Sequence, residues 1–160
     1  YKIGDTIKFT SLDPYRIKIT GRTKSYINAF GEELVIENAE VALAKATKKM
    51  NLEILDYTAG PIFMKNKNKG SHEWIIEFKT NPNDLERFTD LLDQFLKNEN
   101  SDYEAKRYKN IAISIPKVTI AKKGLFYNWL KSKNKLGGQH KIPRLSNDRK
   151  LLDELKKINA

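Results

Sequence analysis

The sequence predicts an α+β fold with a mostly antiparallel sheet of β-α-β-β-α-β order and helices packed on one face of it. A β-hairpin precedes this unit and a C-terminal helix follows it. Two observations predict the class. Several short runs alternate apolar and polar residues, as strands do, whereas residues 36–50 and 85–96 repeat apolar residues every three or four positions, as helices do. At 160 residues, the chain is one domain, or one domain with an appendage.

The first predicted elements are a hairpin and a hinge. Residues 6–10 and 15–19 alternate apolar and polar side chains, and residues 11–14 supply a turn that contains Asp-Pro. Residues 21–24 (Gly-Arg-Thr-Lys) break the alternation, which is typical of a hinge or linker. Residues 26–35 then predict a short pair of strands around a glycine.

The middle of the chain supplies most of the predicted core. A helix is expected over 36–50, strands over 52–58 and 73–79, and an amphipathic helix after Asp84. The polar run 65–70 between the strands reads as a connector. The residues expected on the apolar side of the first helix are Val41, Leu43, Ala44 and Ala46.

The last third combines short elements with one irregular loop. Residues 102–109 predict a short helix, 111–121 a strand interrupted by Pro116, and 124–133 another short helix. The final helix is expected over 148–158. Its expected N-cap is Ser146 or Asn147.

Composition excludes several classes of site. The chain has no cysteine, so disulfides and thiolate metal sites are excluded, and its only histidines are His72 and His140, so no metal site is expected. No apolar run has the length of a membrane span and no signal peptide opens the chain, so we expect a cytoplasmic protein without membrane contact. The sequence starts at Tyr1 inside strand-like sequence, which indicates a piece of a longer protein.

A formal net charge of +10 favours anionic partners, although a lysine-rich genome gives the same composition. The alternative function is therefore a basic α+β nucleic-acid-binding module. Single-strand readers need exposed aromatic side chains. The larger aromatic residues lie instead at core-like spacings, so nucleic acid is an unlikely partner. These residues are Phe78, Phe88, Phe95, Phe126 and Trp129.

Three residues are candidate ligands of an anion or a sugar. Lys141 lies in a loop between a glycine pair and Pro143, which suits a phosphate or carboxylate, or is an ordinary surface loop. Asp5 follows Gly4 at the start of the first predicted strand, where a carboxylate can accept hydrogen bonds from two ribose hydroxyls. The alternative is that Asp5 is an ordinary residue at the start of a strand. Arg22 at the hinge can hold a phosphate or ribose, or is a solvated linker charge.

Three segments, in this order and spacing, together resemble the adenylate-forming enzyme superfamily. Residues 1–5 (Tyr-Lys-Ile-Gly-Asp) resemble its Tyr-Arg-x-Gly-Asp signature, and residues 21–32 resemble its Gly-Arg-x-Asp-x-x-Ile-Lys-x-x-Gly hinge motif. Residues 139–144 (Gln-His-Lys-Ile-Pro-Arg) are similar to the Gln-Tyr-Lys-x-Pro-Arg tail of one branch. That branch is the auxin-responsive Gretchen Hagen family of acyl-acid amido synthetases and its bacterial relatives.

The resemblance implies the C-terminal lid domain of a bacterial-type ligase that adenylates a small carboxylic acid and transfers the acyl group to an amine, such as an amino acid. Residues 1–20 would be a hairpin at the end of the adenylation core, 21–25 the hinge and 26–160 the lid. ATP and Mg would be bound mainly by the missing N-terminal adenylation domain, which is the expected partner. The 160-residue chain alone is therefore expected to be inactive.

The resemblance also implies roles for single residues. Asp5 would bind the ribose hydroxyls of ATP, Arg22 would lie near the nucleotide, and Lys141 would reach the α-phosphate and the acyl carboxylate. The superfamily's hinge aspartate falls on Thr23 or Lys24, depending on the register, and Lys24 is taken as nucleotide-binding. The superfamily's motif lysine is Asn28 in this chain. Arg144 is the rival cation in the loop.

Overall fold

The computed structural model describes residues 5–22, 25–64, 69–110, 112–137 and 140–160, and for residues 5, 6 and 20–22 it describes the backbone alone. The predictions on Lys24 and on the side chains of Asp5 and Arg22 therefore lie outside the described part of the molecule.

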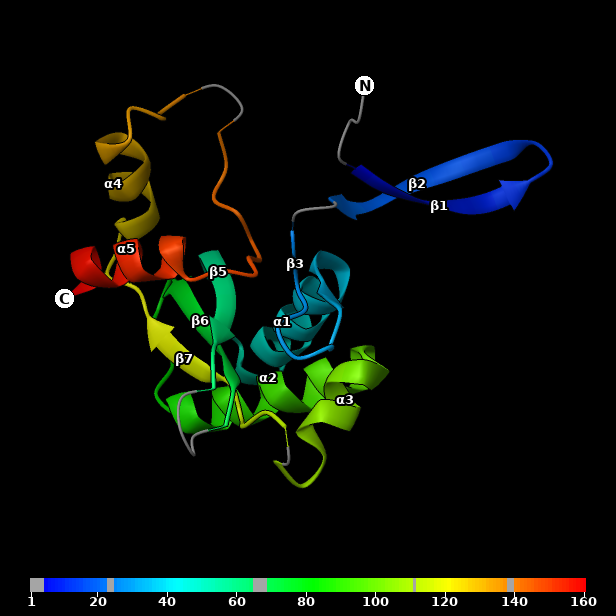
Figure 1. Cartoon of the computed structure of the whole chain (residues 1–160). Helices are drawn as coiled ribbons and strands as arrows, with labels where there is room; N and C mark the ends of the chain where they lie inside the picture. The colour runs from blue at the N-terminus through cyan, green and yellow to red at the C-terminus, as the bar shows by residue number, and fades with distance from the viewer. Residues whose placement is uncertain (1–4, 23–24, 65–68, 111, 138–139) are drawn as a thin grey trace.

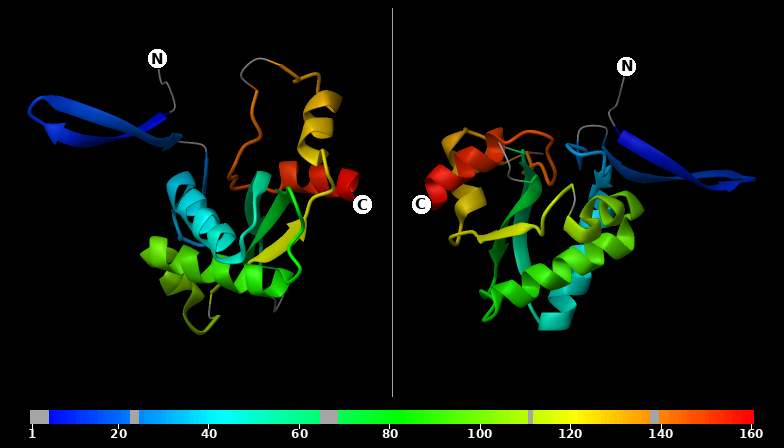
Figure 2. Two further views of the ribbon diagram at one scale, coloured as in Figure 1. Left: turned by 180° about the vertical axis from the view of Figure 1, so that it is seen from behind. Right: turned by 60° about the horizontal axis from the view of Figure 1, so that its bottom comes forward.

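A hairpin opens the described chain. Strands β1 (Asp5–Leu12) and β2 (Tyr15–Arg22) are antiparallel, and Ile7 lies opposite Ile19. Figures 1 and 2 show the hairpin projecting from the rest of the molecule. The predicted hairpin is confirmed, and its apolar side chains are exposed because no other element covers them in this structure.

A short two-stranded ladder follows the hairpin along the chain. Strands β3 (Tyr26–Ile27) and β4 (Leu34–Val35) pair antiparallel, as predicted, and Gly31 between them adopts a left-handed φ of 83°. Helix α1 (Ile36–Met50) starts directly after β4 and has the predicted bounds.

Helix α1 buries one stripe of small and aliphatic residues. The stripe consists of Ala39, Ala42, Leu43 and Ala46. The prediction was wrong for Ala44, which is exposed, and Val41 is only half-buried. Successive residues are 100° apart around a helix, so Ala44 lies nearly opposite Ala42 and Ala46.

The central sheet has three strands in the order β5-β6-β7. Strand β5 (Ile54–Ile62) pairs antiparallel with β6 (Ser71–Phe78), and β6 pairs parallel with β7 (Lys117–Ile120). The α+β class is confirmed, with a mixed pairing in place of a mostly antiparallel one. A helical crossover lies between β6 and β7, and such a connection lets the chain return in the same direction.

The crossover contains two helices and a buried ion pair. Helix α2 (Leu85–Glu99) is capped by Asp84, whose side chain accepts the backbone N–H of Arg87 at 2.8 Å. Helix α3 (Ser101–Arg107) follows, and a 3₁₀ turn, η1 (Tyr108–Asn110), ends the crossover. The Arg107 guanidinium donates to both oxygens of the buried Asp93 carboxylate, at 2.7 and 2.9 Å.

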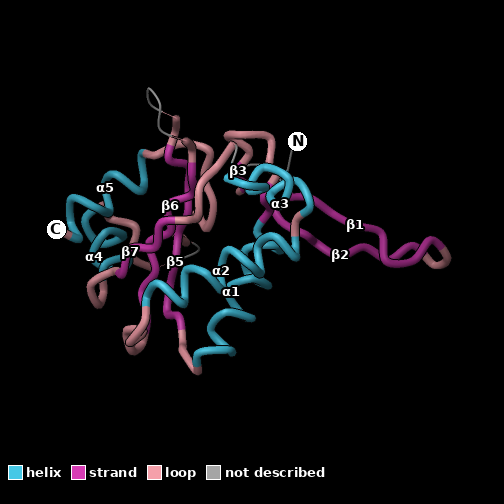
Figure 3. The backbone as a smooth tube through the Cα atoms, turned by 90° about the horizontal axis from the view of Figure 1, so that it is seen from below, coloured by secondary structure: helices cyan, strands magenta, loops and turns pink. Residues whose placement is uncertain are grey.

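Helices cover both faces of the sheet, where the sequence predicted one (Figure 3). Trp74, Ile76 and Phe78 of β6 pack with α1 and α2. Ile75 points the other way and packs against helices α4 (Leu125–Ser132) and α5 (Lys150–Asn159). Every residue of β6 is consequently buried. None of the helices in the described ranges combines the length and low polarity of a membrane span.

Candidate functional site

The candidate site is the loop between α4 and α5, of which the structure describes residues 133–137 and 140–149 (Figure 1). Lys133 to Gly137 are exposed. Gly137 has a φ of 88°, a left-handed conformation that favours glycine, and a side chain there would meet no atom within 4 Å. Backbone conformation therefore requires the glycine.

The second half of the loop is fixed on strand β5. The carbonyl of Pro143 accepts the Thr58 hydroxyl at 2.6 Å. Leu145 forms a parallel bridge with Ala59, whose N–H donates to the Arg144 carbonyl at 2.9 Å. Ile142 is buried in the core between the sheet and α4–α5. The stretch from Ile142 onward thus behaves as a short added strand at the sheet edge.

Arg144 holds this added strand through its side chain. Its guanidinium forms an ion pair with Asp56, donates to the Tyr57 carbonyl at 3.1 Å and lies 4.7 Å from the centre of the Tyr57 ring. Burial, helped by the negative charge of Glu40, raises the pKa of Tyr57 well above its ordinary value, so the phenol stays neutral beneath the cation. Arg144 is therefore occupied in anchoring the loop.

Lys141 differs from Arg144 in all these respects. Its side chain is exposed, and within the described residues it makes no hydrogen bond or ion pair. It directly precedes the buried Ile142, so its backbone lies where the loop becomes fixed. An ammonium in this place is available to an anionic ligand.

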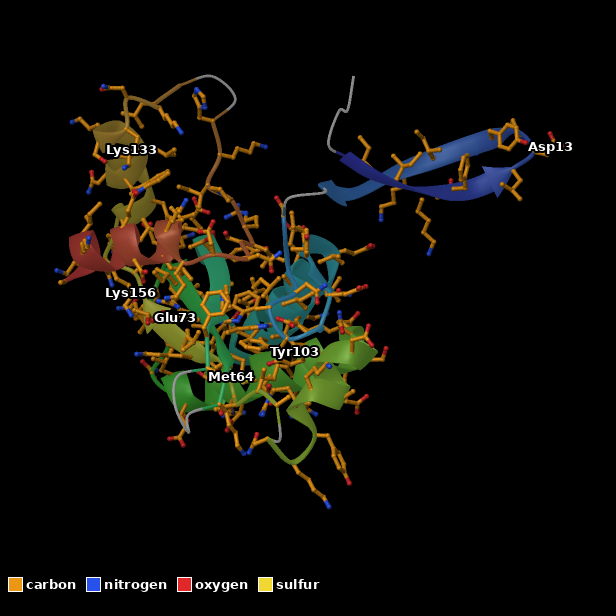
Figure 4. All side chains as sticks on the ribbon, in the orientation of Figure 1. Asp13, Met64, Glu73, Tyr103, Lys133 and Lys156 are labelled. Carbon is orange, nitrogen blue, oxygen red and sulfur yellow. The ribbon has the colours of Figure 1, made fainter. Side chains whose placement is uncertain are left out.

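A second anchor, built on Glu73, holds the end of the loop, and Figure 4 labels Glu73 and Lys156 of this anchor. Arg149 donates to the Pro61 carbonyl at 2.8 Å and to the buried Glu73 carboxylate at 2.6 Å, and Lys156 contacts the other Glu73 oxygen at 3.0 Å. Burial alone would raise the pKa of Glu73, but these two cations hold that pKa below its usual value. The predicted N-cap at Ser146 or Asn147 was wrong, because α5 starts later, with Arg149 at its N-cap position.

The structure brings the segment after the hairpin to the base of this loop. The N–H of Asn28 donates to the side-chain oxygen of Asn147 at 2.6 Å. The backbones of Asp5 and Arg22 lie opposite each other at the hinge end of the hairpin. The backbones of Asp5 and Arg22 are therefore neighbours in the hairpin. The hairpin strands are separate elements from the loop that carries Lys141.

Two residues with a buried polar contact were missed by the sequence reasoning. Glu32 and His72 are both fully buried, and His72 Nε2 lies 2.8 Å from Glu32 Oε1. The one available signal was that Glu32 directly follows the glycine of the hinge motif. The pair lies at the junction of the hinge-side segment and β6.

An open groove among the described residues has a volume of about 880 Å³. It lies between the end of α1 and the start of α2, and its lining includes Met50, Glu53 and Asp84. Lys141 does not line it, so this groove is separate from the candidate site.

Comparison with known proteins identifies relatives of the domain. The family model described as the GH3 family C-terminal domain matches residues 37–150. A solved GH3.15 acyl acid amido synthetase is similar over 98% of this chain and 30% of its own, with a TM-score of 0.73 and 17% identity. A second structure, AtGH3.15 acyl acid amido synthetase in complex with 2,4-DB, gives a TM-score of 0.70 and 17% identity over 97% of this chain and 29% of its own. No curated protein matches the sequence.

Proposed function

The chain belongs to the GH3 family as its C-terminal domain, and from this premise we propose that it is the lid of an ATP-dependent acyl-acid amido synthetase. The observation that carries the proposal is the loop in which Arg144 is held on the sheet while Lys141 is left exposed. The chain spans about 30% of the length of the solved relatives, and in our proposal the rest of the active site lies on an N-terminal adenylation domain of the parent protein.

The proposed reaction has two steps. A carboxylate oxygen of the acid attacks the α-phosphorus of Mg-ATP, and the bond to pyrophosphate breaks, which gives an acyl adenylate. An amine, in our proposal that of an amino acid, then attacks the acyl carbonyl and loses a proton, and AMP leaves with the electrons of the broken bond. Both steps require positioned charges more than a nucleophilic side chain.

Lys141 would act in the first step. Adenylation brings an anionic carboxylate against an anionic triphosphate, so a cation that touches both groups stabilises the transition state most. Arg144 and Ile142 fix the backbone beside Lys141, and Gly137 allows the loop its turn. This arrangement supports a preorganised lysine rather than a freely moving one.

The hinge residues would contact the nucleotide. We propose that Asp5 accepts the ribose hydroxyls and that Arg22 and Lys24 lie beside the phosphates. The opposed backbones of Asp5 and Arg22 support this pairing. The magnesium ion would be held by the missing domain and by ATP, and no residue of this chain is assigned to it. Residues 21–25 would turn the lid between the two steps.

The hairpin would dock on the adenylation core. Phe9 and Ile17 are opposite each other on the apolar side and are 53% and 56% exposed. An exposed apolar face of this kind marks a contact surface. We propose that residues 1–20 belong structurally to the core and that residues 26–160 form the moving lid.

The direct test uses the full-length parent protein with Mg-ATP, a panel of small carboxylic acids and a panel of amino acids. We expect acid-dependent exchange of pyrophosphate into ATP, and amide formation when an amino acid is added. The isolated 160-residue chain should exchange no pyrophosphate. Exchange by this chain alone would overturn the assignment as a lid.

A second candidate function is a basic nucleic-acid-binding module, favoured by the net charge of +10. Such a module should bind DNA or RNA with roughly micromolar affinity, and that affinity should fall steeply as the salt concentration rises. Binding of the full-length protein at about 0.15 M salt, measured by fluorescence anisotropy, separates the two candidates. Tight, steeply salt-dependent binding without acid-dependent exchange would favour the module.

A further inference from the structure

The segment between the hairpin and α1, residues 25–35, is held on β6 by a buried contact between a carboxylate and an imidazole. Glu32 and His72 are fully buried, with Nε2 of the histidine 2.8 Å from Oε1 of the glutamate. The second glutamate oxygen accepts the N–H of Phe30 at 2.7 Å. One oxygen of the Glu32 carboxylate therefore contacts the sheet, and the other accepts a hydrogen bond from within the segment.

Aromatic rings enclose the histidine on two sides. Phe30 stacks on His72 with ring centres 6.4 Å apart, and Tyr103 of α3 lies 5.4 Å away. Phe30 also fills the space above Gly70, where an added Cβ would come within 2.3 Å of the ring. The segment is thus fitted to β6 by shape as well as by a polar contact.

The backbone alone gives this segment little rigidity. Its two strands are two residues long each, and most of it is turn. A second tie reaches the Lys141 loop, because the Asn28 N–H donates to Asn147 at 2.6 Å. Residues 25–35 connect the proposed hinge to the sheet and the anchored loop. A rotation at the hinge therefore moves the sheet only if this segment does not bend.

We propose that Glu32 and His72 are positioning residues that make the hinge-side segment rigid, so that a turn at the hinge moves Lys141 with the sheet. This inference rests on the proposed lid function. A buried polar contact is seldom a net source of stability compared with apolar residues of the same size, because both polar groups lose their hydration. Fixing one arrangement of neighbouring elements is a recognised use of such pairs.

The pair acts on geometry and not on the chemistry itself. Neither side chain is exposed, so neither can touch a substrate. Breaking the pair should let residues 25–35 bend, and the hinge motion would then be absorbed in the segment. The Lys141 ammonium would be delivered less often to its working position, while substrate binding on the other domain would be preserved.

The test compares Glu32→Gln with Glu77→Gln in the full-length protein. Glu77 is a matched control because it is also a buried glutamate whose carboxylate accepts a backbone N–H, that of Gly124 at 2.7 Å, but it lies at the other end of β6 from His72. Two readouts are used: hydrogen exchange of backbone amides, and the maximal rate and KM of ATP–pyrophosphate exchange. Both variants are assayed under conditions in which circular dichroism shows them to be folded.

We expect amides of residues 26–35 to exchange about tenfold faster or more in Glu32→Gln while those of β6 keep their protection, a local opening. The adenylation rate should fall about 2- to 30-fold, the usual range for changes in coupling between sites, with little change in KM for ATP. Glu77→Gln should show neither effect. If Glu32→Gln does not fold, His72→Leu, which removes the donor toward Glu32, is measured in the same way.

Unchanged hydrogen exchange of the amides of residues 26–35 in Glu32→Gln would overturn the inference. So would a wild-type adenylation rate in a variant whose amides at 26–35 exchange faster. A wild-type parent that does not adenylate any acid would instead contradict the proposed function. The hydrogen-exchange result would still decide whether the pair makes the segment rigid, so the two failures are distinguishable.

Discussion

Arg144 and Lys141 carry the same charge in the same loop, but their surroundings differ. Because Arg144 bonds Asp56 and the Tyr57 carbonyl and covers the Tyr57 ring, Arg144→Ala should lower the free energy of unfolding by about 1–2 kcal/mol. The guanidinium is partly exposed, which keeps the effect modest. Urea unfolding measures it, with the exposed Lys135→Ala as the control, expected to change stability by less than about 0.5 kcal/mol. Equal stability of the two variants would contradict the anchoring role.

Asp93 is the residue whose charge should matter most to the stability of the domain. Arg107, Lys97 and Tyr103 all contact its buried carboxylate. Removing the charge leaves the buried Arg107 guanidinium without its counter-charge, so Asp93→Asn should cost about 3–5 kcal/mol at neutral pH. Urea unfolding at pH 7 provides the measurement, and a cost below about 1 kcal/mol would contradict this account.

The same carboxylate predicts a pH dependence. Burial alone would raise the pKa of Asp93, but hydrogen bonds from Arg107, Lys97 and Tyr103 hold that pKa below the ordinary 3.8. A group whose pKa is lowered by folding stabilises the protein above its unfolded pKa, and this contribution is lost as the pH falls through the folded value. The difference between wild type and Asp93→Asn should therefore shrink below about pH 4. A constant difference from pH 7 to pH 3, measured by urea unfolding, would show that the charge is not the cause.

At the scale of elements, the approach of α5 to β5 depends on a glycine. A Cβ at Gly60 would lie 2.8 Å from Leu152 Cδ1 and 3.1 Å from the Asp148 carbonyl. Gly60→Ala should therefore push α5 and the loop end away, with a loss of about 1–3 kcal/mol of stability. Thermal unfolding measures the loss of stability. Gly137→Ala does not serve as a control, because the left-handed φ of Gly137 would itself make an alanine unfavourable. A stability within about 0.5 kcal/mol of wild type would mean that α5 adjusts freely.

Much of the element order could be predicted from sequence, because α1 and α2 have strong apolar periodicity and turn signals at their ends. The prediction began the second sheet strand at Glu73, whereas β6 starts at Ser71. The missed residues are polar, and they are buried because their partners come from distant parts of the chain: Ser71 donates to the Ile115 carbonyl and His72 contacts Glu32. Local pattern carries no information on such partners.

The same reason limits the prediction of the site. The motif resemblance selected Lys141, and its role stays a prediction. Nothing in the local sequence distinguishes its task from that of Arg144, whose partners Asp56 and Tyr57 lie in another strand. Covering of the second sheet face by α4 and α5 was also missed, because alternation alone does not reveal that both faces of β6 are buried.

At the scale of the whole molecule, the hairpin should be stabilised by the domain that it contacts. Ile17→Ser in the isolated chain should change stability by less than about 1 kcal/mol, since only a cross-strand contact is lost. In the full-length protein the same change should cost about 1.5–3 kcal/mol, the value of a buried aliphatic side chain. Paired urea titrations of the two proteins supply the comparison. Equal effects in both would mean that the hairpin does not dock on the core.

The central claim is that the domain delivers Lys141 to the adenylation step, and rapid-quench kinetics of the full-length Lys141→Ala enzyme test it most directly. Acyl-adenylate formation should slow by about 10²–10³, the usual effect of losing one oriented donor. Aminolysis of preformed acyl adenylate should slow far less, because the lid has turned by then, and Lys135→Ala, an exposed lysine of the same loop, should affect neither step. Adenylation at the wild-type rate in Lys141→Ala would contradict the account.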